Sequence, residues 1–149
     1  MVTLKKSNSK DPDFIELVKL LDADLKKRDG EEHDFYAQFN GIKDMEMVVV
    51  AYREHTPIGC GALKEYDNNC MEIKRMFVMP QERGKGIASL ILKTMEKWAR
   101  DNNSSSCILE TGLRQPEAIA LYKKNNYLPQ PNYGPYKGMS NSVCFIKKL

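Results

Sequence analysis

The chain has 149 residues, of which 42% are hydrophobic and 29% are charged, and these shares are typical of globular domains. Its 23 basic and 20 acidic residues give a formal net charge of +3, which is too small for a dedicated nucleic-acid-binding protein. The composition excludes a wholly disordered chain or a fibre, and the length predicts one domain over residues 1–149.

The four cysteines form no C-x-x-C pair and the chain has only two histidines, so we expect no metal site. Cys60, Cys107 and Cys144 lie in apolar stretches, which predicts that they are core residues. No apolar run approaches the roughly 18 residues of a membrane span, and the N-terminus does not resemble a signal peptide. We therefore expect a soluble cytoplasmic protein, a monomer or homodimer, that contacts neither nucleic acid nor membranes.

In the first part of the chain, residues 2–6 predict a short strand. Asp11 followed by Pro12 is typical of a helix start, with Asp11 as the N-cap and Pro12 in the first turn. Apolar residues follow at helical spacing, and Gly30 predicts the end of this helix. A second short helix is expected over residues 31–39.

The rest of the chain predicts six strands and two further helices. Three strands joined by polar turns come first, over residues 45–52, 58–66 and 70–78. A helix over about residues 86–102, a strand over 107–111, a helix over 116–125 and strands over 127–132 and 142–148 follow. The order βααβββαβαββ indicates an α+β fold with a mostly antiparallel sheet, flanking helices and a central strand–helix–strand unit. In the longer helix, the apolar residues expected to form one buried face are Ile87, Leu90, Ile91, Met95 and Trp98.

The loop between the strand at 70–78 and the following helix carries the most specific pattern. Gly84 and Gly86 allow a tight turn and a close approach of the backbone to a ligand. The first N–H groups of a helix have no partner within it, and the helix dipole is positive there, so this end favours a phosphate group. Arg83 and Lys85 would add positive charge at the rim.

Two common phosphate-binding motifs do not match this loop. A P-loop requires Lys and Ser or Thr after its last glycine, whereas Ile87 and Ala88 follow Gly86. The dinucleotide-binding fingerprint needs a third glycine, or an alanine, where this chain has Ser89. Taken alone, the loop therefore leaves open a purely structural turn.

Residues 81–86, with the sequence QERGKG, resemble the [QR]-x-x-G-x-[GA] pyrophosphate loop of the GNAT superfamily of acyl-CoA N-acyltransferases. Further on, residues 118–127 resemble the second signature of that family, with Ala118 and Tyr122 four residues apart on a short helix. The motifs match mainly over residues 71–127, and the order of elements agrees over the whole chain.

The resemblance implies a GNAT-like fold in which two central strands, residues 71–78 and 107–110, splay apart. It implies acetyl-CoA as the cosubstrate, with its pantetheine beside the first strand, and direct acyl transfer to an amine in a ternary complex. The family often has Asn and Gly where this chain has Gln115 and Asn126, a difference that bears on substrate preference. The residues implied in cosubstrate binding are Met76, Phe77, Val78, Arg83, Gly84, Lys85, Gly86, Ile87 and Ala88.

The reaction needs a base, because alkyl ammonium groups have a pKa near ~10.4 and must lose a proton before they attack. Glu72 resembles the position of the general base in some family members, and Glu110 is the second candidate. The alternatives are a strand glutamate paired with a neighbouring lysine and an ion pair within the sheet. Tyr122 is expected to protonate the leaving CoA thiolate, and a plain core tyrosine is its alternative.

The acceptor is expected to contact the region of Glu31, Glu32, His33 and Tyr36 and the turn at residues 133–136. Solvated helix charges and a rigid turn are the alternatives for these two segments. The first hypothesis for the function is an N-acetyltransferase that acts on the primary amine of a small molecule. A protein or peptide N-acetyltransferase and a non-catalytic acyl-CoA-binding module are the alternatives.

Overall fold

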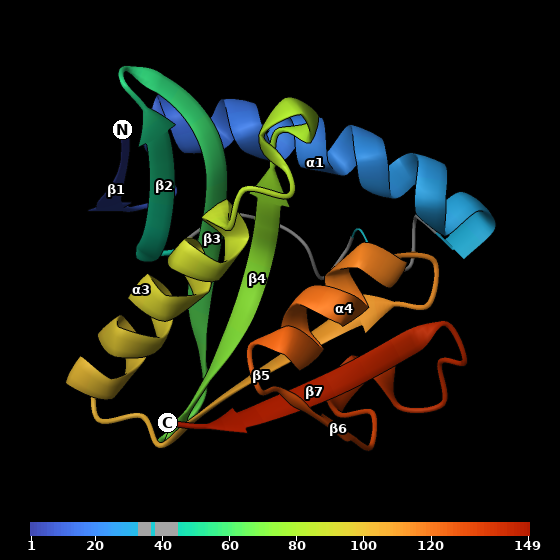
Figure 1. The fold of residues 1–149 in the computed structure, drawn as a ribbon. Coiled ribbons are helices and arrows are strands. Elements are labelled where there is room, and N and C mark those ends of the chain that lie inside the picture. The colour runs from blue at the N-terminus through green and yellow to red at the C-terminus, as the bar shows by residue number, and fades with distance from the viewer. Residues whose placement is uncertain (33–36, 38–44) are drawn as a thin grey trace.

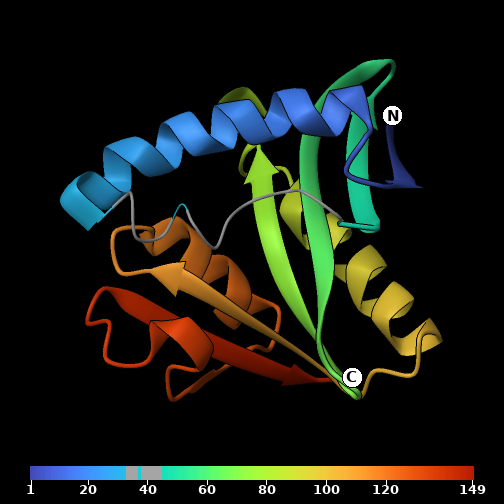
Figure 2. The same cartoon turned by 180° about the vertical axis from the view of Figure 1, so that it is seen from behind.

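The computed structural model describes residues 1–32, 37 and 45–149, and its centre is a mixed seven-stranded sheet (Figures 1 and 2). The strand order is β1-β2-β3-β4-β5-β7-β6. The strands are β1 (Val2–Ser7), β2 (Met47–Arg53), β3 (Thr56–Asp67), β4 (Cys70–Val78), β5 (Ser106–Gly112), β6 (Leu128–Gln130) and β7 (Ser142–Lys148). The α-helices are α1 (Pro12–Asp29), α3 (Ile87–Asp101) and α4 (Pro116–Lys124), and short 3₁₀ turns are η1 (Gly30–Glu32), η2 (Pro80–Glu82) and η3 (Gly134–Tyr136).

The expected α+β order is confirmed, and several element ends lie where the local signals placed them. The side chain of Asp11 accepts a hydrogen bond from Asp13 N at 2.9 Å and caps α1, and Pro12 begins the helix. Gly30 ends α1 with φ 57°. Of the second helix expected over residues 31–39, the described part is η1 and one helical residue at position 37, and the remainder lies outside the described residues.

The two long helices cover opposite faces of the sheet (Figures 1 and 2). Phe14, Leu17 and Leu21 of α1 pack on one face, in a cluster that also contains Phe77 of β4. Residues of α3 pack on the other face together with Tyr122 of α4. The three cysteines expected in the core are buried. Both faces are thereby removed from water over residues 48–51 of β2 and 58–63 of β3, which explains the apolar runs there.

The sheet opens between β4 and β5. These two strands are parallel, and they pair only at Cys70 with Ser106, Met71 with Cys107 and Glu72 with Ile108. Beyond these pairs the strands diverge, while β5 continues to pair with β7 along its whole length (Figure 1). The splay implied by the family resemblance is therefore present.

Strand β4 contains a bulge just beyond the point where it leaves β5. Lys74 and Phe77 pair with residues of β3, but Arg75 and Met76 between them face only Gly61. Arg75 has φ 58°, in the left-handed region that non-glycine residues rarely adopt. The bulge changes the alternation of side chains, so that Lys74 and Arg75 lie on the same face of the sheet, the face covered by α1.

One prediction about α3 is wrong. Leu90, expected on the buried face, is 43% exposed, whereas Glu96 is only 4% exposed. The buried stripe is centred near Met95, which puts Leu90 on the opposite side of the helix. Glu96 is tolerated in the core because Tyr127 Oη donates a hydrogen bond to it at 2.8 Å and Lys147 Nζ lies 2.9 Å away.

Candidate active site

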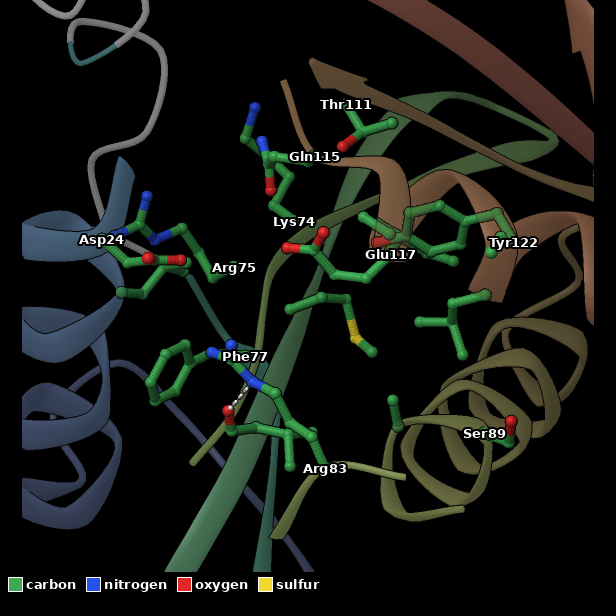
Figure 3. Close-up of a pocket in the computed structure, with 18 of the residues that line it drawn as sticks. Asp24, Lys74, Arg75, Phe77, Arg83, Ser89, Thr111, Gln115, Glu117 and Tyr122 are labelled. Atoms are coloured by element: carbon green, nitrogen blue, oxygen red, sulfur yellow. Dashed lines mark hydrogen bonds between the residues drawn. The ribbon is translucent and has the colours of Figure 1, made fainter. Parts of the chain in front are cut away.

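A cavity of about 440 Å³ lies in the opening between β4 and β5 (Figure 3). Its wall follows β4 from Glu72 to Val78 and continues along the loop and first turn of α3. The opposite wall comes from the end of β5, beginning at Glu110, and from α4, including Tyr122. A single cavity thus joins the predicted phosphate-binding loop to both predicted catalytic residues. Of the residues expected to bind the cosubstrate, Lys85 is the one that does not line it.

The two glycines of the loop have backbone conformations that need glycine and leave open space. Gly84 has φ 80° and Gly86 has φ 81°, and a Cβ atom on either would have no heavy atom within 4 Å. Gly86 caps α3, and the first helical hydrogen bond runs from Leu90 N to Gly86 O at 3.1 Å. The N–H groups of the preceding turn have no partner within the helix and suit an anionic group of a ligand.

The loop is held at its base by a partly buried ion pair. Glu82 of η2 accepts hydrogen bonds from Nε of Arg53 at 3.1 and 3.2 Å and from Nη2 at 2.9 Å. The hydrogen bonds from Arg53 hold the pKa of Glu82 below its usual value. Lys85 Nζ lies 3.5 Å from the same carboxylate. A loop fixed in this way presents its N–H groups without a further ordering cost.

Arg83 is exposed and lines the cavity. Its Nε donates a hydrogen bond of 2.9 Å to the carbonyl oxygen of Val78, and its guanidinium lies over the ring of Phe77 at 5.6 Å (Figure 3). The hydrogen bond therefore ties the side chain of Arg83 to the end of β4.

Tyr122 reaches the cavity from α4 (Figure 3). Its ring packs edge-on against Tyr127 with centroids 5.7 Å apart, and against Phe145 at 6.2 Å. Burial, and to a lesser degree the negative charge of Glu110, raises the pKa of Tyr122 well above its usual value. The hydroxyl is therefore protonated at neutral pH and available as a donor.

Glu72 is 8% exposed and lies in the wall of the cavity. Its Oε2 accepts a hydrogen bond of 2.7 Å from the hydroxyl of Tyr133, and its Oε1 lies 3.6 Å from Lys74 Nζ. Burial lowers the pKa of Lys74, although Glu72 opposes this shift. The pairing with a neighbouring lysine, which the sequence left as an alternative to catalysis, is present in the cavity itself.

The acceptor-binding segments are partly placed. Tyr133 contacts Glu72, and Tyr136 is buried and lines the cavity. Glu31 and Glu32 lie in η1 and do not line it, and His33 and Tyr36 lie outside the described residues.

Sequence reasoning missed several lining residues. Lys74 and Arg75 of β4 line the cavity, as do Thr111 and Gln115 near the end of β5 (Figure 3). The available signal for the first two was a pair of consecutive charged residues inside the strand that leads to the glycine loop.

The described part of the chain contains no helix that is both long and apolar enough to span a membrane. Within residues 1–32 and 45–149, no three side chains of His, Cys, Asp or Glu are grouped closely enough to hold a metal ion.

The chain is similar to known acetyltransferases in sequence and in structure. The model of the acetyltransferase (GNAT) family matches residues 14–127. An IAA acetyltransferase from Azospirillum brasilense is 36% identical in a match that covers 77% of this chain and 80% of that protein. A crystal structure from Klebsiella pneumoniae, named as an acyl-CoA N-acyltransferase, is 27% identical with a TM-score of 0.84 and covers 100% of this chain and 98% of its own.

A third relative has a bound ligand. The PaiA N-acetyltransferase from Thermoplasma acidophilum, solved in complex with coenzyme A, has a TM-score of 0.75 at 18% identity, and the match covers 100% of this chain and 99% of that one. At this identity the likeness concerns the fold. Taken together with the match over residues 14–127, these findings confirm the expected family, fold class and enzyme class: the chain belongs to the acetyltransferase (GNAT) family.

Proposed function

We propose that residues 1–149 form one N-acetyltransferase domain that transfers the acetyl group of acetyl-CoA directly to the primary amine of a small molecule. The observation that carries this proposal is the single cavity that joins the N-terminal end of α3 to Glu72 and Tyr122. An acyl donor held at one end and an amine held at the other would meet inside the splay, without a covalent enzyme intermediate.

The donor end is supported by the loop after β4. The pyrophosphate of acetyl-CoA would accept hydrogen bonds from main-chain N–H groups between Arg83 and Ala88, where Gly84 and Gly86 leave room. The pantetheine arm would run along β4 beside residues 76–78, where the strand no longer pairs with β5. This strand edge offers unpaired main-chain groups that an amide-containing arm can satisfy.

The reacting end is supported by the positions of Glu72 and Tyr122. Glu72 would accept a proton from the acceptor ammonium, directly or through water, so that the neutral amine attacks the thioester carbonyl. Tyr122 would donate its proton to the departing thiolate, whose conjugate acid has a pKa near ~8.5. Glu110, on the opposite wall, is the second carboxylate that a proton could reach.

The test is a thiol-release assay with acetyl-CoA and a panel of free amines, run beside peptides with free N-termini and lysines. Release with free amines, together with the acetylated amine in the product mixture, supports the proposal. Release with peptides alone supports the peptide acetyltransferase instead. Tight binding of acetyl-CoA with no release for any acceptor supports a non-catalytic binding module.

A further inference from the structure

Two buried cationic side chains lie next to each other in the wall of the cavity. The side chain of Lys74 is 7% exposed and that of Arg75 is 1% exposed, and both line the cavity (Figure 3). In a regular strand, consecutive residues point to opposite faces. The bulge at Arg75 removes this alternation and brings both cations to the face of α1.

The hydrogen-bonding capacity of this pair is only partly used by the protein. Lys74 Nζ lies 3.6 Å from Glu72 Oε1, which is longer than a normal hydrogen bond, and the other oxygen of Glu72 is bonded to Tyr133. Arg75 pairs with Asp22 of α1 through Nη2. Its Nε is buried and has no hydrogen-bond partner among the described residues. Buried donors without a partner destabilise a fold, so they are informative where they line a cavity.

The backbone at Arg75 adds an independent observation. A left-handed conformation at a non-glycine residue is strained, and such strain concentrates at ligand-binding and active sites. The bulge places the side chains of Lys74 and Arg75 on the same face of the sheet, where the guanidinium of Arg75 is directed towards α1 and pairs with Asp22.

We propose that Lys74 and Arg75 bind a carboxylate of the acceptor, so that the acceptor is an amine that also carries a carboxylate, as amino acids do. This inference rests on the proposed function and specifies its substrate class. Guanidinium and ammonium groups are the usual partners of a carboxylate, and the planar guanidinium can donate two parallel hydrogen bonds to it.

The cavity carries charges of both signs, which suit the ammonium group and the carboxylate of such an acceptor. Glu72 and Glu110 line the cavity and attract the ammonium group, while Lys74 and Arg75 attract the carboxylate. The phosphates of the cosubstrate belong to a different place, since α3 begins on the other face of the sheet from this cationic pair. The pair is therefore available to the acceptor.

The experiment measures kcat/KM for amino acids and for their primary amides, with acetyl-CoA as the donor. The panel contains glycine, L-phenylalanine, L-leucine and 5-aminopentanoate, each beside its amide. The parent enzyme should prefer the carboxylate in the best pair, and Lys74→Met should lower this preference at least about tenfold, because a charge-assisted hydrogen bond is lost. The preference is the ratio of kcat/KM for the amino acid to kcat/KM for its amide. Dividing the ratio of a variant by the ratio of the parent cancels the different intrinsic reactivities of the two amines.

Lys93→Met is the matched control, because it removes an exposed lysine of α3 that does not line the cavity, and it should keep the parental preference. Arg75→Met should lower the preference like Lys74→Met, whereas Asp22→Asn should keep it, since it removes only the partner on α1. If Asp22→Asn abolishes the preference as fully as Arg75→Met, Arg75 acts by anchoring α1 and its part of the inference is wrong.

The outcomes separate this inference from the proposed function. Thiol release with amines but equal rates for acids and amides, or an unchanged preference in Lys74→Met, overturns the carboxylate site and leaves the acetyltransferase intact. No thiol release with any amine overturns both.

Discussion

The hydroxyl of Tyr133 donates a 2.7 Å hydrogen bond to Oε2 of Glu72, although the two residues are 61 positions apart in the chain. Tyr133 immediately precedes η3, in the connection between β6 and β7, and Glu72 lies at the last pairing position of β4 with β5. Burial, followed by the charge of Glu72, raises the pKa of Tyr133, so this hydroxyl is a donor throughout the physiological range. The turn expected to face the acceptor thus also holds the carboxylate proposed as the base.

Tyr133→Phe should lower kcat/KM. The substitution removes the hydroxyl that holds Oε2 of Glu72, so the carboxylate is less well positioned to accept a proton from the acceptor. We expect a loss of about tenfold at neutral pH, corresponding to one hydrogen bond to a charged group. The measurement is kcat/KM at neutral pH with an acceptor amine whose own pKa lies below the pH of the assay.

Tyr66→Phe is the control for this prediction. Tyr66 packs edge-on against Tyr133 with centroids 5.2 Å apart, is 45% exposed and does not line the cavity. Its hydroxyl should be dispensable for kcat/KM. An unchanged kcat/KM in Tyr133→Phe, or an equal loss in Tyr66→Phe, would show that the contact does not position the base. Glu72→Gln should lower kcat/KM further, because it removes the proton acceptor itself.

Tyr122→Phe should lower kcat by about 10²–10⁴-fold when chemistry limits turnover, because a proton donor to the thiolate is lost. The ring contacts with Tyr127 and Phe145 remain, so the melting temperature and the affinity for CoA should change little. Since the pKa of Tyr122 is raised, its ionisation should not produce the alkaline limb of the parent profile. Tyr52→Phe, which removes a hydroxyl bound to Asp13 outside the cavity, serves as the control. An unchanged kcat would assign Tyr122 a structural role.

Asp11 should make the stability of the fold depend on pH. Burial alone would raise the pKa of Asp11, but hydrogen bonds from Lys5, Ser7 and the Asp13 backbone outweigh it and lower the pKa below 3.8. A carboxyl with a lowered pKa stabilises the fold above its unfolded pKa, and this stabilisation is lost as the pH falls through the folded pKa. The free energy of unfolding of the parent should therefore fall below about pH 4.

Two variants isolate this contribution in urea titrations at several pH values. Asp11→Asn keeps a side chain that caps helices well but removes the charge, so its deficit relative to the parent should shrink as the pH falls below 4. Asp11→Ala also removes the cap and should lose about 0.5–2 kcal/mol more. A deficit of Asp11→Asn that is constant from pH 7 to pH 3 would contradict the assignment.

The ion pair between Arg53 and Glu82 allows the order of the loop to be tested without changing Glu72 or Tyr122. Arg53→Met should leave Glu82 without its main partner and loosen the base of the loop, because three hydrogen bonds are lost. We expect the dissociation constant of acetyl-CoA to rise several-fold, with kcat at saturation nearly unchanged, since the reacting groups stay in place. Arg100→Met, at an exposed position in the last turn of α3, is the control. Equal dissociation constants in the parent and Arg53→Met would show that the ion pair does not order the loop.

The element order and the glycine turn before α3 were predictable because their signals are local. Asp11 and Pro12 mark a helix start within a few residues, and the glycines of residues 81–86 mark a turn before a helix. The bulge at Arg75 was not predictable, because it depends on which residue of β3 lies opposite. The alternation of Glu72 and Lys74 gave no sign that the next residue would point the same way.

Contacts between distant segments account for the other differences. The burial of Glu96 depends on Tyr127 and Lys147, which come 31 and 51 residues later. The apolar spacing in α3 alone therefore placed the buried face too close to Leu90. The hydrogen bond from Tyr133 to Glu72 was likewise not predictable, because the sequence around Tyr133 gives no sign of a contact with β4.

The central claim is that acetyl-CoA binds at the glycine loop that begins α3, and calorimetric titration of acetyl-CoA into Gly86→Glu tests it most directly. Gly138→Glu is the matched control, because Gly138 has φ 80°, also has no heavy atom near a built Cβ, and does not line the cavity. We predict that Gly86→Glu weakens binding at least about a hundredfold, through bulk and negative charge beside the pyrophosphate, while Gly138→Glu binds like the parent. Equal affinity in the parent and in Gly86→Glu would contradict the account.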